Sequence, residues 1–240
     1  MMVTVIGRGH SGTRVIAETL RNSGVYMGNK FNKSSDFIPA KYMYWAAKIN
    51  KHVKYKGHYK WDFSYLKKNE PSDDFKDNIN RYLKPVLDSK SEHKGWKLPE
   101  TVFAYPWLIK MFPDMNYIIW NRHPYDSVLS PHKSDRFDVW RIDFPLEGID
   151  EHMHRAVSWK YQYEIIRSTP PPKNIIHVKY EDFVKHPVRE KRRLEKFLGI
   201  SLKLPKLYTS RVERWRREPS INYNEFSFLR KPMRRLGYNR

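Results

Sequence analysis

The residues of this chain that could hold an anion appear first in the stretch "GRGHSGTR", residues 7–14, which places glycines at positions 7, 9 and 12. A β-branched run, "MVTVI", precedes it, and "TRVIAETLRN" follows with apolar residues at helical spacing, so the stretch is predicted to join a strand to a helix. Glycines let the backbone approach an anion closely, and the first turn of a helix offers N–H groups and a partial positive charge. The pattern therefore predicts a phosphate-binding loop.

Two common nucleotide sites do not fit this loop. A nucleotide-hydrolysing loop has the pattern GxxxxGK[ST], but Thr13 follows Gly12 here, and no strand ends in an aspartate that would clearly hold magnesium. The dinucleotide pattern GxGxxG is met by the three glycines, yet no acidic residue follows about 20 positions later at the end of a second strand. The loop therefore disfavours both ATP or GTP hydrolysis and dinucleotide binding.

A second pair of anion-binding residues lies in "YIIWNRHPYDSVLS", where Arg122 ends a predicted strand and Ser130 follows eight residues later, at the expected start of a helix. Arginine offers a planar fork to phosphate oxygens, and a serine hydroxyl adds a neutral donor. An Arg and a Ser eight positions apart mean little alone. Behind a phosphate loop, and in a strand–turn–helix context, they predict a second anion site.

Together, "GHSGTR" and the Arg122–Ser130 pair resemble the sulfotransferases that use 3′-phosphoadenosine 5′-phosphosulfate (PAPS), of the carbohydrate-directed or the bacterial and phage type. In that family the loop wraps the 5′-phosphosulfate, and the Arg and Ser hold the 3′-phosphate. The resemblance implies that His10 takes the place of the family's loop lysine as a catalytic group, unless Arg8 or Arg14 supplies the cation. The donor-binding residues that it implies here are Arg8, Gly9, His10, Ser11, Gly12, Thr13, Arg14, Arg122 and Ser130.

A third likeness lies in "WKLPE", residues 96–100, which resembles the family's second strand. One branch of the family keeps a histidine base where this chain has Lys97, and the carbohydrate-directed branch keeps a lysine. The resemblance implies that Lys97 faces the sulfuryl oxygens as a cation or a base. Glu100 is favoured over His58 and Asp62 as the general base for the acceptor's proton, because it follows the Lys97 segment, and His10 is a further candidate behind these three.

Two segments near the C-terminus also resemble the family. "IIHVKYEDFVKHP", residues 175–187, is similar to a strand end of its C-terminal half, and "LRKPMRRLGY", residues 229–238, is similar to the basic tail that closes over the 3′-phosphate. The second likeness implies that Arg230 and Arg235 bind the donor.

Strands that alternate with helices are expected to position these residues, which predicts an α/β fold with a mainly parallel sheet. The resemblance makes this a three-layer, P-loop-kinase-like fold, with residues 1–240 as one sulfotransferase domain. Within it we expect a helical acceptor-site insertion over 31–90 and a basic tail over 200–240. The other expected elements are helices over 39–53, from Ser72, over 149–169 and, as the final helix, over 189–200, and strands over 94–98, 116–122 and 174–183.

The composition agrees with an anionic ligand. The net charge is +20, and residues 181–240 contribute a net +10 through 17 Lys and Arg against 7 Asp and Glu. Such a field attracts nucleic acid, anionic membranes, acidic glycans or a phosphorylated cofactor. The chain has no cysteine, which excludes disulfides and thiolate metal sites, and no apolar run of membrane-spanning length. We expect a cytoplasmic protein.

The hypothesis from the sequence is a PAPS-dependent sulfotransferase that needs no metal, releases adenosine 3′,5′-bisphosphate (PAP) and sulfates a hydroxyl or amine. The Tyr- and Trp-rich residues around 42–65 favour a glycan or another ring-bearing acceptor. Two alternatives stay open at this point. One is a P-loop kinase-like phosphotransferase, and the other is a non-enzymatic, basic nucleic-acid-binding protein.

Overall fold

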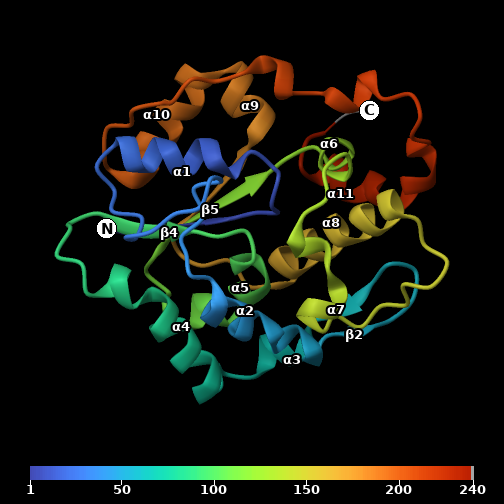
Figure 1. Ribbon diagram of the computed structural model, residues 1–240, viewed down its shortest axis with the longest axis horizontal. Coiled ribbons are helices and arrows are strands. Elements are labelled where there is room, and N and C mark those ends of the chain that lie inside the picture. The colour runs from blue at the N-terminus through green and yellow to red at the C-terminus, as the bar shows by residue number, and fades with distance from the viewer. Residues whose placement is uncertain (239–240) are drawn as a thin grey trace.

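A four-stranded parallel sheet forms the centre of the molecule, in the order β4-β1-β5-β6 (Figure 1). Its strands are β1 (Met2–Ile6), β4 (Lys94–Lys97), β5 (Asn116–Asn121) and β6 (Ile175–Lys179). The computed structural model describes residues 1–238, so the last two positions of the basic tail expected over 200–240 lie outside the described residues. The predicted α/β class with its parallel sheet is confirmed.

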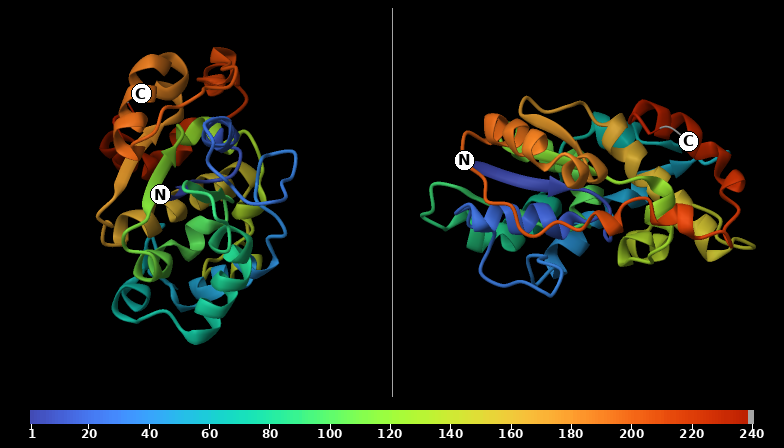
Figure 2. Two further views of the ribbon diagram at one scale, coloured as in Figure 1. Left: turned by 90° about the vertical axis from the view of Figure 1, so that its left-hand side faces the viewer. Right: turned by 90° about the horizontal axis from the view of Figure 1, so that it is seen from above.

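Helices cover both faces of this sheet (Figures 1 and 2). Along β5, Ile118 and Trp120 pack with α1 (Thr13–Asn22), α9 (Tyr180–Lys185) and α10 (Pro187–Leu198). The alternate residues Tyr117 and Ile119 pack in the larger core on the opposite face, because successive side chains of a strand point to opposite sides. The helices of that core are α2 (Lys41–Ala46), α4 (Asp73–Leu87), α5 (Thr101–Met111), α7 (Phe137–Trp140) and α8 (Glu151–Ser168).

The remaining elements are short. An antiparallel pair, β2 (Lys54–Tyr55) and β3 (Trp61–Asp62), lies at the edge of the larger core. The other short elements are α3 (Ser64–Lys68), α6 (Pro124–Val128), α11 (Arg230–Arg235) and the 3-10 turns η1 (Ala47–His52), η2 (Lys133–Asp135), η3 (Thr209–Arg211), η4 (Arg214–Arg217) and η5 (Tyr223–Leu229). Among the described residues no helix combines the length and the apolar character needed to cross a membrane.

Several expected boundaries are confirmed. Ser72 caps α4, because its hydroxyl accepts a hydrogen bond from the Phe75 N–H at 3.3 Å, and Asp73 and Asp74 occupy the first turn. Pro124 is the first residue of α6, and Gly199 ends α10 in the left-handed conformation.

Three expected boundaries were wrong. The strand expected over 174–183 ends at Lys179, and α9 begins at Tyr180, where Glu181 and Asp182 stabilise the N-terminus of a helix. α10 is not the last helix, since α11 follows. Ser130 does not begin a helix but lies two residues beyond the end of α6, because Pro131 disfavours helical geometry at the residue before it.

The topology explains why distant motifs meet. From β1 the chain crosses to β4 on one side of β1 and then returns to β5 on its other side. Ligands of open parallel sheets bind where the strand order reverses in this way, at the carboxyl ends of the strands. Residues 7–14, 97–100 and 122–130 follow β1, β4 and β5, so all three predicted motifs emerge at this one edge.

Candidate functional site

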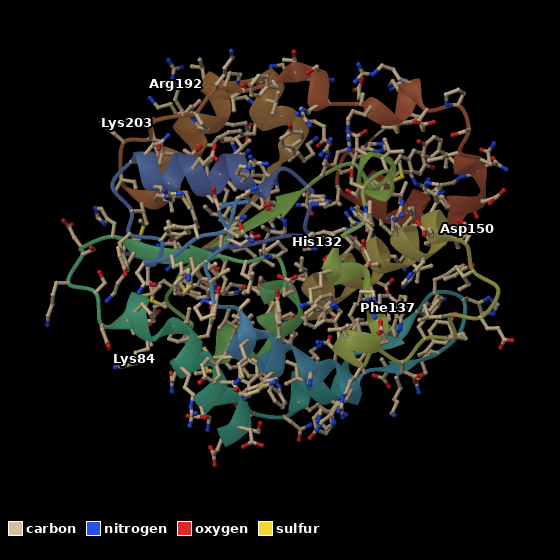
Figure 3. All side chains as sticks on the ribbon, viewed as in Figure 1. Lys84, His132, Phe137, Asp150, Arg192 and Lys203 are labelled. Carbon is tan, nitrogen blue, oxygen red and sulfur yellow. The ribbon has the colours of Figure 1, made fainter. Side chains whose placement is uncertain are left out.

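The loop after β1 is packed so closely that two of its glycines have no substitute. A Cβ atom on Gly9 would overlap the imidazole of His132, a side chain that lies toward the middle of the molecule (Figure 3). Gly12 has φ 81° as the N-cap of α1, and a Cβ atom there would lie 2.5 Å from the ring of Tyr180. The turn is therefore fixed by its neighbours, with the first-turn amides of α1 directed at its mouth.

Arg8 is buried and holds the loop to the segment after α6. Its Nε and Nη2 donate to the two carboxylate oxygens of Asp135 at 3.0 and 2.6 Å, and Nη2 also donates to the Ser130 carbonyl at 3.0 Å. This bidentate pair occupies the guanidinium. Arg8, which the sequence offered as a donor-binding cation, is thus placed behind the loop and bound to a carboxylate.

His10 and Arg14 are the exposed side chains of the loop. Burial and the nearby charge of Arg8 lower the pKa of His10, and its ring makes an edge contact with that of His132, with the ring centroids 5.0 Å apart. The imidazole is therefore neutral at neutral pH and acts as a hydrogen-bond donor or acceptor. Within residues 1–238 no carboxylate pairs with Arg14, whose charge also lowers the pKa of Lys97.

Arg122 joins the two predicted anion sites. Its side chain is buried at the end of β5, and its Nη1 donates to the His10 carbonyl at 3.1 Å. Its Nη2 donates to Asp126 at 3.1 Å and to the Arg211 carbonyl, and the guanidinium lies 4.7 Å from the ring centroid of Tyr180. The loop after β1 and the turn after β5 are thus adjacent, as the sequence hypothesis requires.

A second arginine, Arg214, completes this cluster. Its Nη2 donates to the Ser130 hydroxyl at 3.2 Å and to the Asp126 carbonyl at 3.3 Å. Burial and the charge of Arg122 lower the pKa of Arg214, so the two guanidinium groups repel each other across a single carboxylate, Asp126. The Nε atoms of both arginines are buried and have no hydrogen-bond partner among residues 1–238. Two guanidinium groups with unpaired donors beside a serine hydroxyl fit a phosphate monoester.

Lys97 is the last residue of β4, and Glu100 follows it three residues later. The Lys97 ammonium is buried, forms an ion pair with Asp36 and donates to the Ser34 carbonyl at 2.6 Å. Burial lowers the pKa of Lys97 and the charge of Asp36 opposes that shift. The segment around residue 36 is itself held by β4, because the Phe37 N–H donates to the Lys97 carbonyl at 2.9 Å.

Glu100 is a buried carboxyl at the N-terminus of α5. Burial raises its pKa to about 7, with a further contribution from Asp36, while the charges of Lys133 and Lys97 act in the opposite direction. A carboxyl that titrates near neutral pH can accept a proton from an acceptor group and later release it. The structure places it within electrostatic reach of Lys97.

Other residues that the sequence singled out lie away from this cluster. Arg230 and Arg235 are exposed on α11, and Arg235 lines a separate hollow together with His58 and Lys160. Asp62 ends β3, and its carboxylate accepts the N–H of Ser64, the first residue of α3, at 2.9 Å. Of the four candidate bases, Glu100 and His10 lie at the carboxyl ends of the parallel strands, in the segments after β4 and β1.

Sequence reasoning missed Arg214, Asp126, Asp135 and Asp36. The run "RWRR", residues 214–217, is a signal for Arg214 in the sequence, whereas the resemblance of the tail implied Arg230 and Arg235 instead. Glu181 of the "YEDF" segment has a structural role. Its carboxylate accepts the His123 N–H at 2.8 Å and the Tyr238 hydroxyl at 3.0 Å, which fixes the turn after Arg122.

Comparisons with known proteins agree with this geometry. The model of a family described as "Sulfotransferase family" matches residues 3–203. No curated protein matches the chain. Among solved structures, a sulfotransferase from Alicyclobacillus acidocaldarius is 14% identical, with 99% of this chain and 96% of that chain covered and a TM-score of 0.54.

Two further solved structures are similar. The sulfotransferase domain from the Synechococcus PCC 7002 olefin synthase is 14% identical, with 100% of this chain and 95% of that chain covered and a TM-score of 0.57. The sulfotransferase STF9 from Mycobacterium avium is 13% identical, with 99% and 77% covered and a TM-score of 0.54. At this level of identity the structures establish a common fold.

Proposed function

This chain belongs to the sulfotransferase family, and from that premise we propose that it transfers a sulfuryl group from PAPS to a hydroxyl or amine of an acceptor, with a carbohydrate as the favoured acceptor. PAP is the second product. We further propose that residues 1–240 act as one domain, in which residues 31–90 build the acceptor side.

The residues around the loop are proposed to divide the donor between them. The backbone N–H groups of residues 11–14, with His10 and Arg14, would hold the 5′-phosphosulfate end at the N-terminus of α1. Arg122, Ser130 and Arg214 would hold the 3′-phosphate, whose two negative charges would relieve the repulsion between the two guanidinium groups. Arg8 contributes indirectly by fixing the loop against Asp135.

The chemical step is proposed to depend on positioning and on fixed charges. When bound, the donor supplies an activated sulfuryl group and PAP as the leaving group. Glu100 would take the proton of the acceptor hydroxyl as the new S–O bond forms, and Lys97 and Arg14 would stabilise the negative charge on the sulfuryl oxygens and on the departing oxygen. A carboxyl whose pKa is about 7 is half ionised at neutral pH and so is available as a base.

The observation that supports this proposal is the hydrogen bond from Arg122 to the His10 carbonyl, which joins the loop after β1, proposed to bind the 5′-phosphosulfate, to the residues proposed to bind the 3′-phosphate. ADP and ATP lack a 3′-phosphate, so this second cluster favours PAP over them. A kinase-like site would not need it.

Calorimetry with PAP, 5′-AMP and ATP tests the proposal. We expect tight binding of PAP, with 5′-AMP and ATP weaker by about 100-fold, which corresponds to two charge-assisted hydrogen bonds. Ser130→Ala and Arg214→Gln should each reduce PAP affinity by about 10-fold or more and leave the weak binding of 5′-AMP unchanged. Exposed Arg192 on α10 provides the control, as Arg192→Gln. Equal affinity for all three nucleotides would exclude PAPS as the donor.

A further inference from the structure

A hollow in the surface lies between α2 and α7, on the side of the larger core. Its volume is about 570 Å³, and Lys41, Tyr44, Trp45, Lys48 and Arg141 line it. These residues come from the 31–90 region and from the turn that ends α7. The donor cluster described above uses none of them.

Tyr44 connects this hollow to Glu100. The negative charge of Glu100 contributes to the raised pKa of Tyr44, so the phenol and the carboxyl lie within electrostatic reach of each other. The ammonium of Lys133 lies 4.1 Å from the ring centroid of Tyr44, and its charge also acts on Glu100. Tyr44 and Lys133 therefore couple the hollow electrostatically to the proposed base, which makes the hollow a candidate for the place where an acceptor enters.

Trp45 gives the hollow a flat apolar surface. Its side chain is 43% exposed, an unusual position for the largest apolar residue. Tyr42 supports the ring edge-on, with centroids 5.4 Å apart, and the Lys41 ammonium lies 4.6 Å from its centroid. An indole held in this way offers a stacking face to the apolar side of a sugar ring or to an aromatic ring.

The charges around Trp45 are not neutralised by the chain. Within the described residues no carboxylate forms an ion pair with Lys41, Lys48 or Arg141. Asp138 is the one acidic residue among those that line the hollow, and Arg136 binds both of its oxygens, at 2.9 and 2.6 Å. Among the described residues, three cations without a carboxylate partner therefore line the hollow around Trp45, a combination that suits a ring bearing a negative group.

We propose that the acceptor is an acidic saccharide, with one ring stacked on Trp45 and its carboxylate or sulfate bound by Lys48 and Arg141. The hydroxyl to be sulfated would then point past Tyr44 toward Glu100. This inference rests on the proposed function and narrows its acceptor from carbohydrates in general to anionic ones. Neutral sugars would stack on Trp45 but would leave Lys48 and Arg141 without a negative partner.

Calorimetry on the full chain, saturated with PAP, tests the proposal with a matched set of trisaccharides. Galactotriose is the neutral probe, trigalacturonic acid carries carboxylates at C6, and galactotriose sulfated at C6 carries sulfates. We expect the two acidic probes to bind at least 10-fold more tightly than galactotriose, which is the value of one charge-assisted hydrogen bond. A preference for one acidic probe over the other identifies the anionic group that the hollow selects.

Three variants locate the binding. Lys48→Gln combined with Arg141→Gln should weaken both acidic probes by about 10- to 100-fold and leave galactotriose unchanged. Trp45→Ala should weaken all three probes by about 10-fold, since stacking does not depend on charge. Lys196→Gln combined with Lys203→Gln removes the same charge from exposed positions outside the hollow and is the control.

The outcomes separate this inference from the proposed function. Equal affinity for neutral and acidic probes, or an equal loss in the control variant, overturns the acidic acceptor even if PAP binds. Failure of PAP to bind overturns the proposed function, and the same titrations without PAP then still decide whether the hollow selects acidic saccharides.

Discussion

The proposed donor cluster, around Arg8, Arg122 and Arg214, and the hollow beside Trp45 differ in how their charged residues are paired. Around the loop, Arg8 and Arg122 are buried, and each is held by a carboxylate and by backbone carbonyls. Around the hollow, Lys48 and Arg141 have no carboxylate partner within the described residues, and Trp45 faces solvent. Lys97 ends β4, and Glu100 precedes α5.

The contrast is the one that the proposed ligands of the two regions would require. A donor with phosphate groups at a fixed separation is bound best by rigid cations that are shielded from water. Such cations do not have to reorganise when negative charge develops in the transition state. That rigidity depends on carboxylates, since a buried arginine without a partner is strongly destabilising. An acceptor site needs no such internal pairing, because the ligand itself supplies the negative charge. Substitutions should therefore affect stability as well as ligand affinity in the proposed donor region, and mainly ligand affinity in the hollow.

The largest effect is expected from Asp135→Asn in the donor region. The change leaves the buried Arg8 guanidinium without its carboxylate and should reduce the free energy of unfolding by about 3–5 kcal/mol, measured by urea denaturation. Asp77→Asn removes the partner of the exposed Arg81 and should leave the urea midpoint nearly unchanged. Similar losses of stability in the two variants would show that the buried ion pair contributes no more to stability than the exposed one.

Glu100→Gln tests the proposed general base. Loss of the proposed base should reduce kcat by about 10²- to 10⁴-fold, with PAP affinity retained. In the unsubstituted protein, kcat should fall as the pH drops below about 7, because the carboxylate that accepts the proton becomes protonated. Glu147→Gln, at an exposed position, is the control. A variant that keeps its activity would remove Glu100 from the mechanism.

The same substitution should stabilise the protein at high pH. The pKa of Glu100 is raised from 4.5 to about 7 in the folded state, so the folded state binds the proton more tightly than the unfolded state does. The unsubstituted protein therefore loses stability as the pH rises from about 4.5 to about 7, by up to about 3 kcal/mol. Glu100→Gln should abolish that loss, seen as a higher Tm at pH 8 and an unchanged Tm at pH 4. An identical pH dependence in both proteins would contradict the raised pKa.

Two glycines with a similar positive φ allow a further test of how closely the loop after β1 is packed. Gly12 and Gly24 both have positive φ, 81° and 86°, but no atom lies within 4 Å of a Cβ placed on Gly24. Gly24→Ala should cost only the left-handed strain, about 1–2 kcal/mol. Gly12→Ala adds the overlap with Tyr180, so it should lower the free energy of unfolding by at least about 1 kcal/mol more than Gly24→Ala does. It should also lower the affinity for PAP.

The smallest effect on stability is expected in the acceptor hollow. Trp45→Ala should change the free energy of unfolding by less than about 1 kcal/mol, because the ring is largely at the surface. Trp140→Ala, at a fully buried position near the same hollow, should cost about 3–5 kcal/mol. A large stability loss in Trp45→Ala would assign this ring to the core and remove the argument for a stacking surface.

The part of the site that could be predicted from the sequence is the part made by backbone and by short motifs. Glycines at 7, 9 and 12 ahead of a helix require a strand–loop–helix turn, and Arg122 at the end of a strand must emerge at the same sheet edge. Arg214 could not be predicted in this way, because it reaches Ser130 from a 3-10 turn 84 residues further along the chain. Local sequence periodicity does not predict a contact between residues so far apart in the sequence.

The sequence by itself determined the elements, the parallel sheet and the loop, since hydrophobic periodicity and glycine geometry act over a few neighbouring residues. The tertiary structure alone decided which charges are paired. Arg8 meets Asp135 and Lys97 meets Asp36 across separations of 127 and 61 residues, whereas Lys48 and Arg141 line one hollow without forming an ion pair with a carboxylate of residues 1–238. Pairing depends on where folding brings each side chain, and that position is set by the packing of the whole core.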